Sequence, residues 1–126
     1  MAYAAKPLIL VVEDDDVTRM DAVVMIRDAG YDVLEASNAD EAIAFLDSAL
    51  PIAVMFTDIE MPGLIDGQRL AHAVRDRWPP VRIVATSGHF DLPSFGILPD
   101  GALFLPKPYV NAAVTRTLNE ILSRAA

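Results

Sequence analysis

One stretch of the chain constrains its fold more than any other. It is the apolar run from Ile52 to Thr57, which stops at the carboxylate of Asp58. The run has the length of a β-strand and little of the polar alternation that would leave one face in water. Such a strand is typical of the centre of a parallel sheet covered on both faces, and functional groups collect beyond the carboxyl ends of such strands. The sequence therefore predicts that a buried strand delivers Asp58 to a functional rim.

Strand-length apolar segments alternate with helical patterns along the whole chain. We expect strands at residues 8–12, 33–36, 52–58, 81–86 and 102–105. Helices are expected at residues 17–29, between Asn38 and Pro51, between the loop at residues 61–67 and Pro79, and at residues 110–124. This alternation predicts one α/β domain over residues 1–126, a doubly wound five-stranded parallel sheet with right-handed crossovers and helices on both faces.

Local signals define the first two helices and one irregular connection. The buried stripe of the first helix is predicted from its helical spacing as Met20, Val23, Val24 and Ile26. Asp15 or Asp16 is its predicted N-cap, and Asn38 with Glu41 resembles a capping box for the second helix. Residues 88–101 contain two prolines and three glycines, so the fourth crossover helix should be short, distorted or absent.

The composition excludes several functional classes. The chain has no cysteine, which rules out disulfides, thiolate metal sites and cysteine nucleophiles. A formal net charge of -8 argues against nucleic-acid binding through a basic face, because phosphate groups would be repelled. No apolar stretch approaches membrane-spanning length, and the first residues do not resemble a signal peptide. We therefore expect a cytoplasmic protein without direct contact to nucleic acid or membrane.

Polar side chains follow four of the predicted strands at their carboxyl ends, namely Glu13 and Asp14, Asp58, Thr86 and Ser87, and Lys107. Crowded carboxylates raise one another's pKa, and a divalent cation relieves that repulsion. Oxygen ligands without cysteine or nearby histidine favour Mg²⁺. Lys107 can pair with Asp58 or with a phosphoryl group, and Ser87 supplies a hydroxyl donor, with Thr86 as its competitor.

Four sequence strings make the resemblance to a known family specific. LILVVEDDD, FTDIEMPGLIDG, IVATSGH and FLPKPY resemble the signature regions of CheY-like receiver domains of two-component response regulators. The resemblance covers nearly the whole chain and implies the flavodoxin-like strand order 2-1-3-4-5. It implies that Asp58 is the phosphoacceptor and that Ser87 and Lys107 bind phosphoryl oxygens. It also implies a cis bond between Lys107 and Pro108.

The same resemblance implies a metal site and a signalling reaction. Glu13 and Asp14 would form the acidic pair that holds Mg²⁺ with Asp58, Asp14 being the direct ligand, and the main-chain carbonyl of Glu60 would complete the shell. A sensor histidine kinase or histidine phosphotransfer protein would donate its phosphoryl group to Asp58, and water would later remove it. Phe104 would then turn inward as a switch. The chain would be a phosphoacceptor, not a turnover enzyme.

The wider role follows from the same resemblance. The chain would be a stand-alone receiver or one excised from a hybrid kinase. With no room for a DNA-binding domain, it would signal to a downstream protein target or pass the phosphoryl group to another histidine.

Three features depart from the usual receiver pattern. The switch position holds Phe104 where tyrosine is frequent, so no hydroxyl is available there. The loop at residues 61–67 is one residue longer than usual, which should change its surface and leave the chemistry intact. The proline-broken stretch at residues 89–100 puts the usual fourth helix in question, and with it the face through which many receivers dimerise, so dimerisation through that face is not carried over from the resemblance.

Two other functional classes remain open from the sequence. Asp14, Asp16 and Thr18 match the Asp-x-Asp-x-Thr pattern of haloacid-dehalogenase-like phosphatases, although only Glu120 follows Lys107 as a further acid. A receiver-like module that binds proteins without phosphorylation is the third possibility. A flavin-binding module fits less well, because its first loop should present hydroxyls and N–H groups in place of acids.

Overall fold

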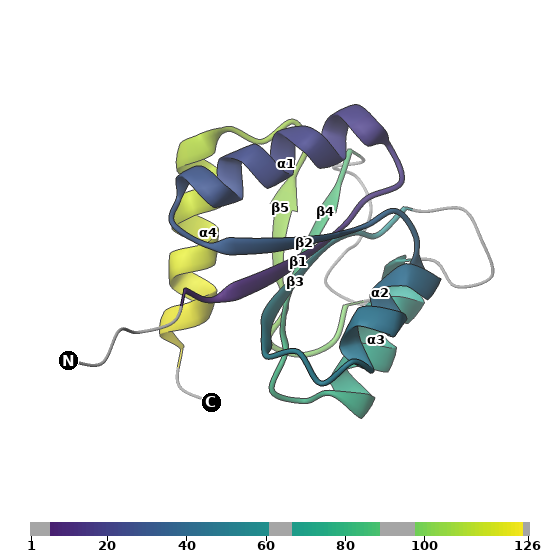
Figure 1. Cartoon of the computed structure of the whole chain (residues 1–126). Coiled ribbons are helices and arrows are strands. Elements are labelled where there is room, and N and C mark those ends of the chain that lie inside the picture. The colour runs from purple at the N-terminus through teal and green to yellow at the C-terminus, as the bar shows by residue number, and fades with distance from the viewer. Residues whose placement is uncertain (1–5, 61–66, 89–97, 125–126) are drawn as a thin grey trace.

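Five strands and four helices make up the described part of the chain. The computed structural model describes residues 6–60, 67–88 and 98–124. In chain order the elements are β1 Leu8–Val12, α1 Asp16–Asp28, β2 Asp32–Ala36, α2 Ala39–Leu46, β3 Ile52–Asp58, α3 Gly67–Arg77, β4 Arg82–Ser87, β5 Leu103–Pro106 and α4 Asn111–Ser123 (Figure 1). Within these ranges no helix combines the length and the apolar character needed to cross a membrane.

The five strands form one parallel sheet in the order β2-β1-β3-β4-β5. This confirms the doubly wound fold and the flavodoxin-like strand order. The longest strand, β3, lies at the centre, where both of its faces are covered. The fourth and fifth strands each extend one residue further toward the rim than predicted and begin one residue later. Ser87 is therefore the last residue of β4, where the prediction had placed it just beyond the strand.

Helices cover the sheet on both faces, with α1 and α4 on one side and α2 and α3 on the other (Figure 1). Successive residues of β1 alternate between two apolar cores, because side chains along a strand point to opposite faces. Ile9 and Val11 pack with α1 and α4, whereas Leu10 and Val12 pack with α2 and α3. Both cores therefore meet at the sheet and hold its strand ends in place.

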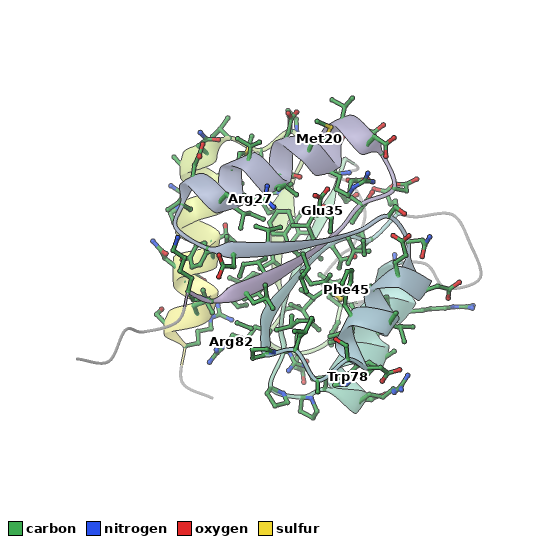
Figure 2. All side chains as sticks on the ribbon, in the orientation of Figure 1. Met20, Arg27, Glu35, Phe45, Trp78 and Arg82 are labelled. Carbon is green, nitrogen blue, oxygen red and sulfur yellow. The ribbon has the colours of Figure 1, made fainter. Side chains whose placement is uncertain are left out.

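The buried face of α1 differs from the predicted one. Ala22, Val23 and Ile26 are buried, whereas Met20 is 62% and Val24 57% exposed. Figure 2 shows Met20 on the side of α1 that is turned away from the sheet. The helix carries two apolar stripes, so spacing alone could not identify the one that meets the core. The prediction was wrong for Met20 and Val24.

The predicted caps are confirmed, with one change. The Asp15 carboxylate accepts the N–H of Thr18 at 2.8 Å and caps α1. Asn38 caps α2 by accepting the N–H of Glu41 at 2.8 Å. The Glu41 carboxylate accepts the N–H of Ser37, one residue before the cap, so the reciprocal bond of a capping box is displaced by one position.

The fourth crossover and the extended loop lie largely outside the described residues. The irregular connection between β4 and β5 falls mainly on residues 89–97, and the longer loop falls on residues 61–66. The predictions made for both segments therefore stay predictions. Leu98 to Ala102 form the turn that leads into β5, which includes Gly101 in the left-handed region at φ +85°.

Candidate functional site

The register of the sheet brings the predicted site residues to one rim. Val12 pairs with Thr57, so Glu13, which follows β1, and Asp58, the last residue of β3, lie at the same level of the sheet. Asp58 pairs with Thr86, and Ser87 pairs with Pro106, the residue before Lys107. Four chain segments thus end side by side, which confirms the convergence predicted from the parallel sheet.

Asp58 is held at the bottom of this rim with both carboxylate oxygens engaged. The Asp58 residue is 5% exposed. Oδ1 accepts the main-chain N–H of Glu60 at 2.9 Å, and Oδ2 accepts Lys107 Nζ at 3.1 Å. The carboxylate is therefore fixed in direction while its charge is balanced by one ammonium group.

Lys107 joins Asp58 to Glu13, which is buried beside it. Lys107 Nζ donates to Glu13 Oε1 at 2.6 Å, and Glu13 Oε2 accepts the N–H of Asp15 at 3.2 Å. Burial raises the pKa of the Glu13 carboxyl, an effect that its bond to Lys107 opposes and the charge of Asp58 reinforces. Burial alone would lower the pKa of Lys107, but the bond to Glu13 and the charge of Asp58 raise it on balance. The lysine therefore stays protonated at neutral pH.

Glu13, Asp14 and Asp58 form an acidic cluster that could hold a metal ion. One carboxylate oxygen from each lies within 4.8 Å of the others, with Glu13 and Asp58 buried and Asp14 exposed. Three oxygen donors on one side and solvent on the other suit a hard divalent cation that keeps several waters. The donor set therefore fits Mg²⁺, and the predicted carbonyl ligand from Glu60 stays a prediction.

Ser87 lies on the same rim, and its hydroxyl donates to the Glu60 carboxylate. The Ser87 residue is fully buried at the end of β4, and its carbonyl accepts the N–H of Lys107 at 2.8 Å. Thr86 is also buried, and its carbonyl accepts the N–H of Ile59 at 3.0 Å. Ser87 thus stands beside the acid cluster, with a side-chain partner that the sequence did not suggest.

The fifth strand carries the predicted switch residue and the cis bond. Phe104 is half-buried and lines a hollow of about 440 Å³ with residues 98–103. The bond between Lys107 and Pro108 is cis, as the family resemblance implied. Inward rotation of Phe104 stays a prediction.

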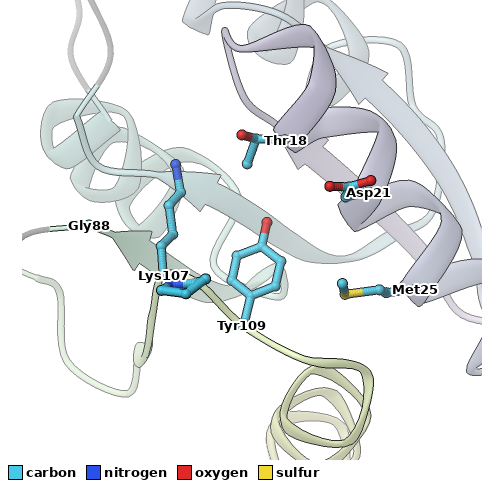
Figure 3. A pocket seen from close by; sticks show the side chains of 7 residues that line it. Thr18, Asp21, Met25, Gly88, Lys107 and Tyr109 are labelled. Carbon is cyan, nitrogen blue, oxygen red and sulfur yellow. The ribbon is translucent and has the colours of Figure 1, made fainter.

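A pocket of about 470 Å³ opens beside Lys107, and its walls include residues that the sequence analysis did not select. Figure 3 shows Lys107 and Tyr109 facing Thr18, Asp21 and Met25 of α1 across this space. The Tyr109 ring packs edge-on against Phe56 with centroids 5.6 Å apart, and burial raises the pKa of its phenol to about 12. Tyr109 is the last residue of the string FLPKPY, so its place in that string could have identified it from the sequence.

Gly67 is a second residue that the sequence analysis missed. It opens α3 directly against the end of β3, where a Cβ atom would lie 1.9 Å from the carbonyl oxygen of Asp58. Only glycine permits this approach, because both groups are backbone. The sequence feature that could have identified it is a glycine at the end of the loop that follows Asp58.

The sequence and the structure resemble known proteins over most of the chain. Residues 9–119 match the family described as Response regulator receiver domain. The chain is 30% identical over 92% of its length to the sensor kinase CckA of Brucella abortus, and 37% identical over 68% of its length to the hydrogenase transcriptional regulatory protein HoxA of Cupriavidus necator. It spans 12% and 17% of these two proteins, respectively.

Solved structures give the same result. A response regulator receiver protein of Sinorhizobium medicae has a TM-score of 0.86 at 28% identity, covering 93% of this chain and 94% of that chain. The receiver domain of the hybrid histidine kinase CckA has a TM-score of 0.77 at 32% identity, covering 92% of this chain and 99% of that chain. Each of these structures therefore shares the fold of this chain over more than nine-tenths of its length.

Proposed function

Because this chain belongs to the family of response regulator receiver domains, we propose that its Asp58 carboxylate accepts a phosphoryl group from a protein phosphohistidine. Receiver domains are phosphoacceptor signalling domains, and the comparisons support that role and not the phosphatase or the binding-only module. One observation carries the proposal for Asp58: it is the buried carboxylate held between Lys107 and the Glu60 N–H, within the acidic cluster.

The reaction uses the groups at the rim. An oxygen of Asp58 forms the new O–P bond as the N–P bond of the phosphohistidine breaks, and the departing imidazole keeps the electron pair. Lys107 balances negative charge on the phosphoryl oxygens, and the Ser87 hydroxyl donates to one of them. Water later cleaves the acyl phosphate and restores the carboxylate. The domain accepts and releases one group per cycle and is not a turnover enzyme.

Receiver domains bind Mg²⁺ at an acidic pocket, and Glu13, Asp14 and Asp58 supply such a pocket here. The proposal assigns the ion to these three carboxylates and the main-chain carbonyl of Glu60, with Asp14 as a direct ligand. When bound, Mg²⁺ supplies positive charge that neutralises the phosphoryl oxygens. This is the chemistry that the oxygen-only donor set suits best.

Phosphorylation would change the conformation of residues at the ends of β4 and β5. The phosphoryl group carries about 1.5 to 2 negative charges, in place of the single charge of the carboxylate, and its oxygens draw Ser87 and its loop toward Asp58. The side chain of Phe104 on β5 then turns toward the space that the loop vacates. The result is a shift between two packings of the same domain.

Upstream partners in this proposal are a sensor histidine kinase or a histidine phosphotransfer protein, classes with which receiver domains interact. The exposed apolar side chains Val17, Met20 and Val24 recur at helical spacing on α1, next to the pocket beside Lys107. A protein donor must cover the surface around Asp58 to bring its histidine within bonding distance. We propose that this stripe contacts the helix of the donor protein that carries the phosphohistidine.

Downstream, the proposal includes a protein target or onward transfer to another histidine, in the cytoplasm where ATP phosphorylates the donor. The curated relatives are regulators and kinases much longer than this chain. Output through protein contact agrees with the acidic charge of the chain, which disfavours direct contact with nucleic acid.

The test is Asp58-dependent phosphorylation. Incubation with Mg²⁺ and acetyl phosphate, or with a phosphorylated kinase domain, should add one phosphoryl unit to the wild type by intact mass. Asp58→Asn should gain none, whereas Asp28→Asn, at an exposed acid in α1, should match the wild type. A wild type that gains no phosphoryl unit from a competent donor would refute the proposal. Steady turnover that needs Asp14 but not Asp58 would indicate a phosphatase instead.

A further inference from the structure

Glu60 connects the phosphoacceptor to the hydroxyl that is expected to bind its phosphoryl group. Its main-chain N–H donates to Asp58 Oδ1 at 2.9 Å. Its side-chain Oε1 accepts the hydroxyl of Ser87. The backbone of one residue therefore orients Asp58 while its carboxylate holds Ser87, two positions that act on the same incoming group.

The hydroxyl of Ser87 can serve only one anion at a time. A serine side chain has one proton to donate, and here that proton points at the Glu60 carboxylate. The Ser87 residue is fully buried at the end of β4. A phosphoryl oxygen on Asp58 and the Glu60 carboxylate would therefore compete for the same donor.

The charges around the rim strengthen this competition. Glu13, Asp14 and Asp58 already place three carboxylates within 4.8 Å of one another, and Lys107 is engaged by two of them. An acyl phosphate at Asp58 carries about two negative charges on its phosphoryl oxygens, where the carboxylate carried one, and Asp58 lies two positions before Glu60 in the chain. Like charges repel, so two anions that share the Ser87 hydroxyl disfavour each other.

We propose that the Glu60 carboxylate is a positioning group that retains the Ser87 hydroxyl in the unphosphorylated domain and opposes binding of a phosphoryl group at Asp58. This inference rests on the proposed function of Asp58. It assigns to Glu60 a role in setting how readily this receiver enters its phosphorylated state, separate from its predicted main-chain carbonyl ligand.

Removing the side-chain charge of Glu60 should make the site bind a phosphoryl mimic more tightly. Beryllofluoride, which binds carboxylates as a tetrahedral phosphoryl mimic, is titrated calorimetrically into the full chain at saturating Mg²⁺. Glu60→Gln should bind it about tenfold more tightly than the wild type, the size of effect expected when one charged hydrogen bond no longer competes. Glu60→Ala, which cannot bond to Ser87 at all, should show at least the same gain.

Two controls separate this competition from a general effect of charge. Glu120→Gln removes one negative charge at the far end of α4, where Glu120 pairs with Arg124, and it should leave the affinity unchanged. A Ser87→Ala variant has no hydroxyl for the two anions to compete for. In that variant, the increase in beryllofluoride affinity caused by Glu60→Gln should largely disappear. Unfolding curves of all variants establish that each is folded before titration.

The outcomes distinguish this inference from the proposed function. Equal beryllofluoride affinity of the wild type and Glu60→Gln would overturn the role of Glu60 and leave Asp58 as the acceptor. An equal gain from Glu60→Gln with and without Ser87 would also overturn it, because the effect would then be charge alone. If neither the wild type nor Glu60→Gln bound beryllofluoride or gained a phosphoryl unit, the proposed function would fail together with this inference.

Discussion

Lys107 is the residue on which the electrostatics of the site depend. Its ammonium group contacts the two buried carboxylates, Glu13 at 2.6 Å and Asp58 at 3.1 Å. Removal of one partner from a buried ion pair leaves uncompensated charge, which costs far more than the pair contributes. Lys107 itself remains 22% exposed at its side chain, so water relieves part of that cost.

We expect Lys107→Met to lower the free energy of unfolding by about 2 kcal/mol at pH 7, less than for a fully buried pair because of this exposure. The pKa of Glu13 already lies above its ordinary value of 4.5 and should rise further without the lysine. The loss of stability should therefore shrink as the pH falls through the raised pKa, since protonated Glu13 no longer repels Asp58. Urea unfolding at pH 7 and at pH 4 measures both effects.

Lys6→Met is the matched control, because Lys6 is the only other lysine in the chain and is exposed. It should unfold like the wild type at both pH values. A pH-independent loss for Lys107→Met would contradict the assignment and indicate lost packing of the side-chain stem.

Gly67 shows how one missing Cβ atom shapes the acceptor region. Gly67→Ala would place a methyl group 1.9 Å from the Asp58 carbonyl oxygen, so the backbone of β3 or α3 must move. We expect a loss of about 1 to 3 kcal/mol in the free energy of unfolding. Gly88→Ala is the control, since a Cβ atom there meets nothing within 4 Å. Equal urea midpoints for the two variants would refute the close approach.

At the scale of elements, α1 has one face that packs into the core and one exposed apolar face. Ala22, Val23 and Ile26 pack against the sheet and α4, while the opposite stripe of exposed apolar side chains faces outward. Exposed apolar residues arranged in a stripe mark interaction surfaces more often than isolated ones do. The same helix also lines the pocket beside Lys107 through Thr18, so its outer face borders the reaction site.

We expect Met20→Glu to slow phosphoryl transfer from a phosphohistidine protein about tenfold at subsaturating donor, because a charge would be buried in the contact. Transfer from acetyl phosphate should be unchanged, since a small donor needs no docking surface. Leu50→Glu, at an exposed apolar residue before β3, is the control and should affect neither donor. Equal slowing with both donors would show that Met20→Glu disturbs the site and not the docking surface.

The other helices mainly pack on the two faces of the sheet and so fix the relative positions of the strand ends. Helices α2 and α3 pack on Leu10, Val12 and Met55, and α1 and α4 pack on the opposite face. Neither core contains the charged residues of the rim. The site can therefore vary in charge without a direct loss of core packing.

At the scale of the whole molecule, the site exists only because a parallel sheet gathers distant segments. Glu13 and Lys107 bond across 94 positions, and Asp58 and Lys107 across 49. Each crossover returns the chain to the same edge of the sheet, so every strand contributes its carboxyl end to one rim. This topology explains why a domain of 126 residues can concentrate four acidic residues, a lysine and a serine in one place.

The sequence by itself determined the fold class, the strand order through family resemblance, and the residues at the rim. Apolar runs of strand length that end at Glu13, Asp58 and Lys107 needed only periodicity and composition to be recognised, because burial of backbone and side chain in a parallel sheet demands that pattern. The caps at Asp15 and Asn38 were likewise local signals, and both are confirmed.

Tertiary structure alone decided which of these groups meet and with what partners. Two apolar stripes on α1 are equivalent in sequence, and only packing against the sheet buried Val23 and exposed Met20. The bond from Ser87 to Glu60 and the approach of Gly67 to Asp58 depend on strand register and loop closure, which bring together residues that no local pattern links. Strand periodicity is local and can be read along the chain, whereas side-chain partners across strands are set by three-dimensional packing.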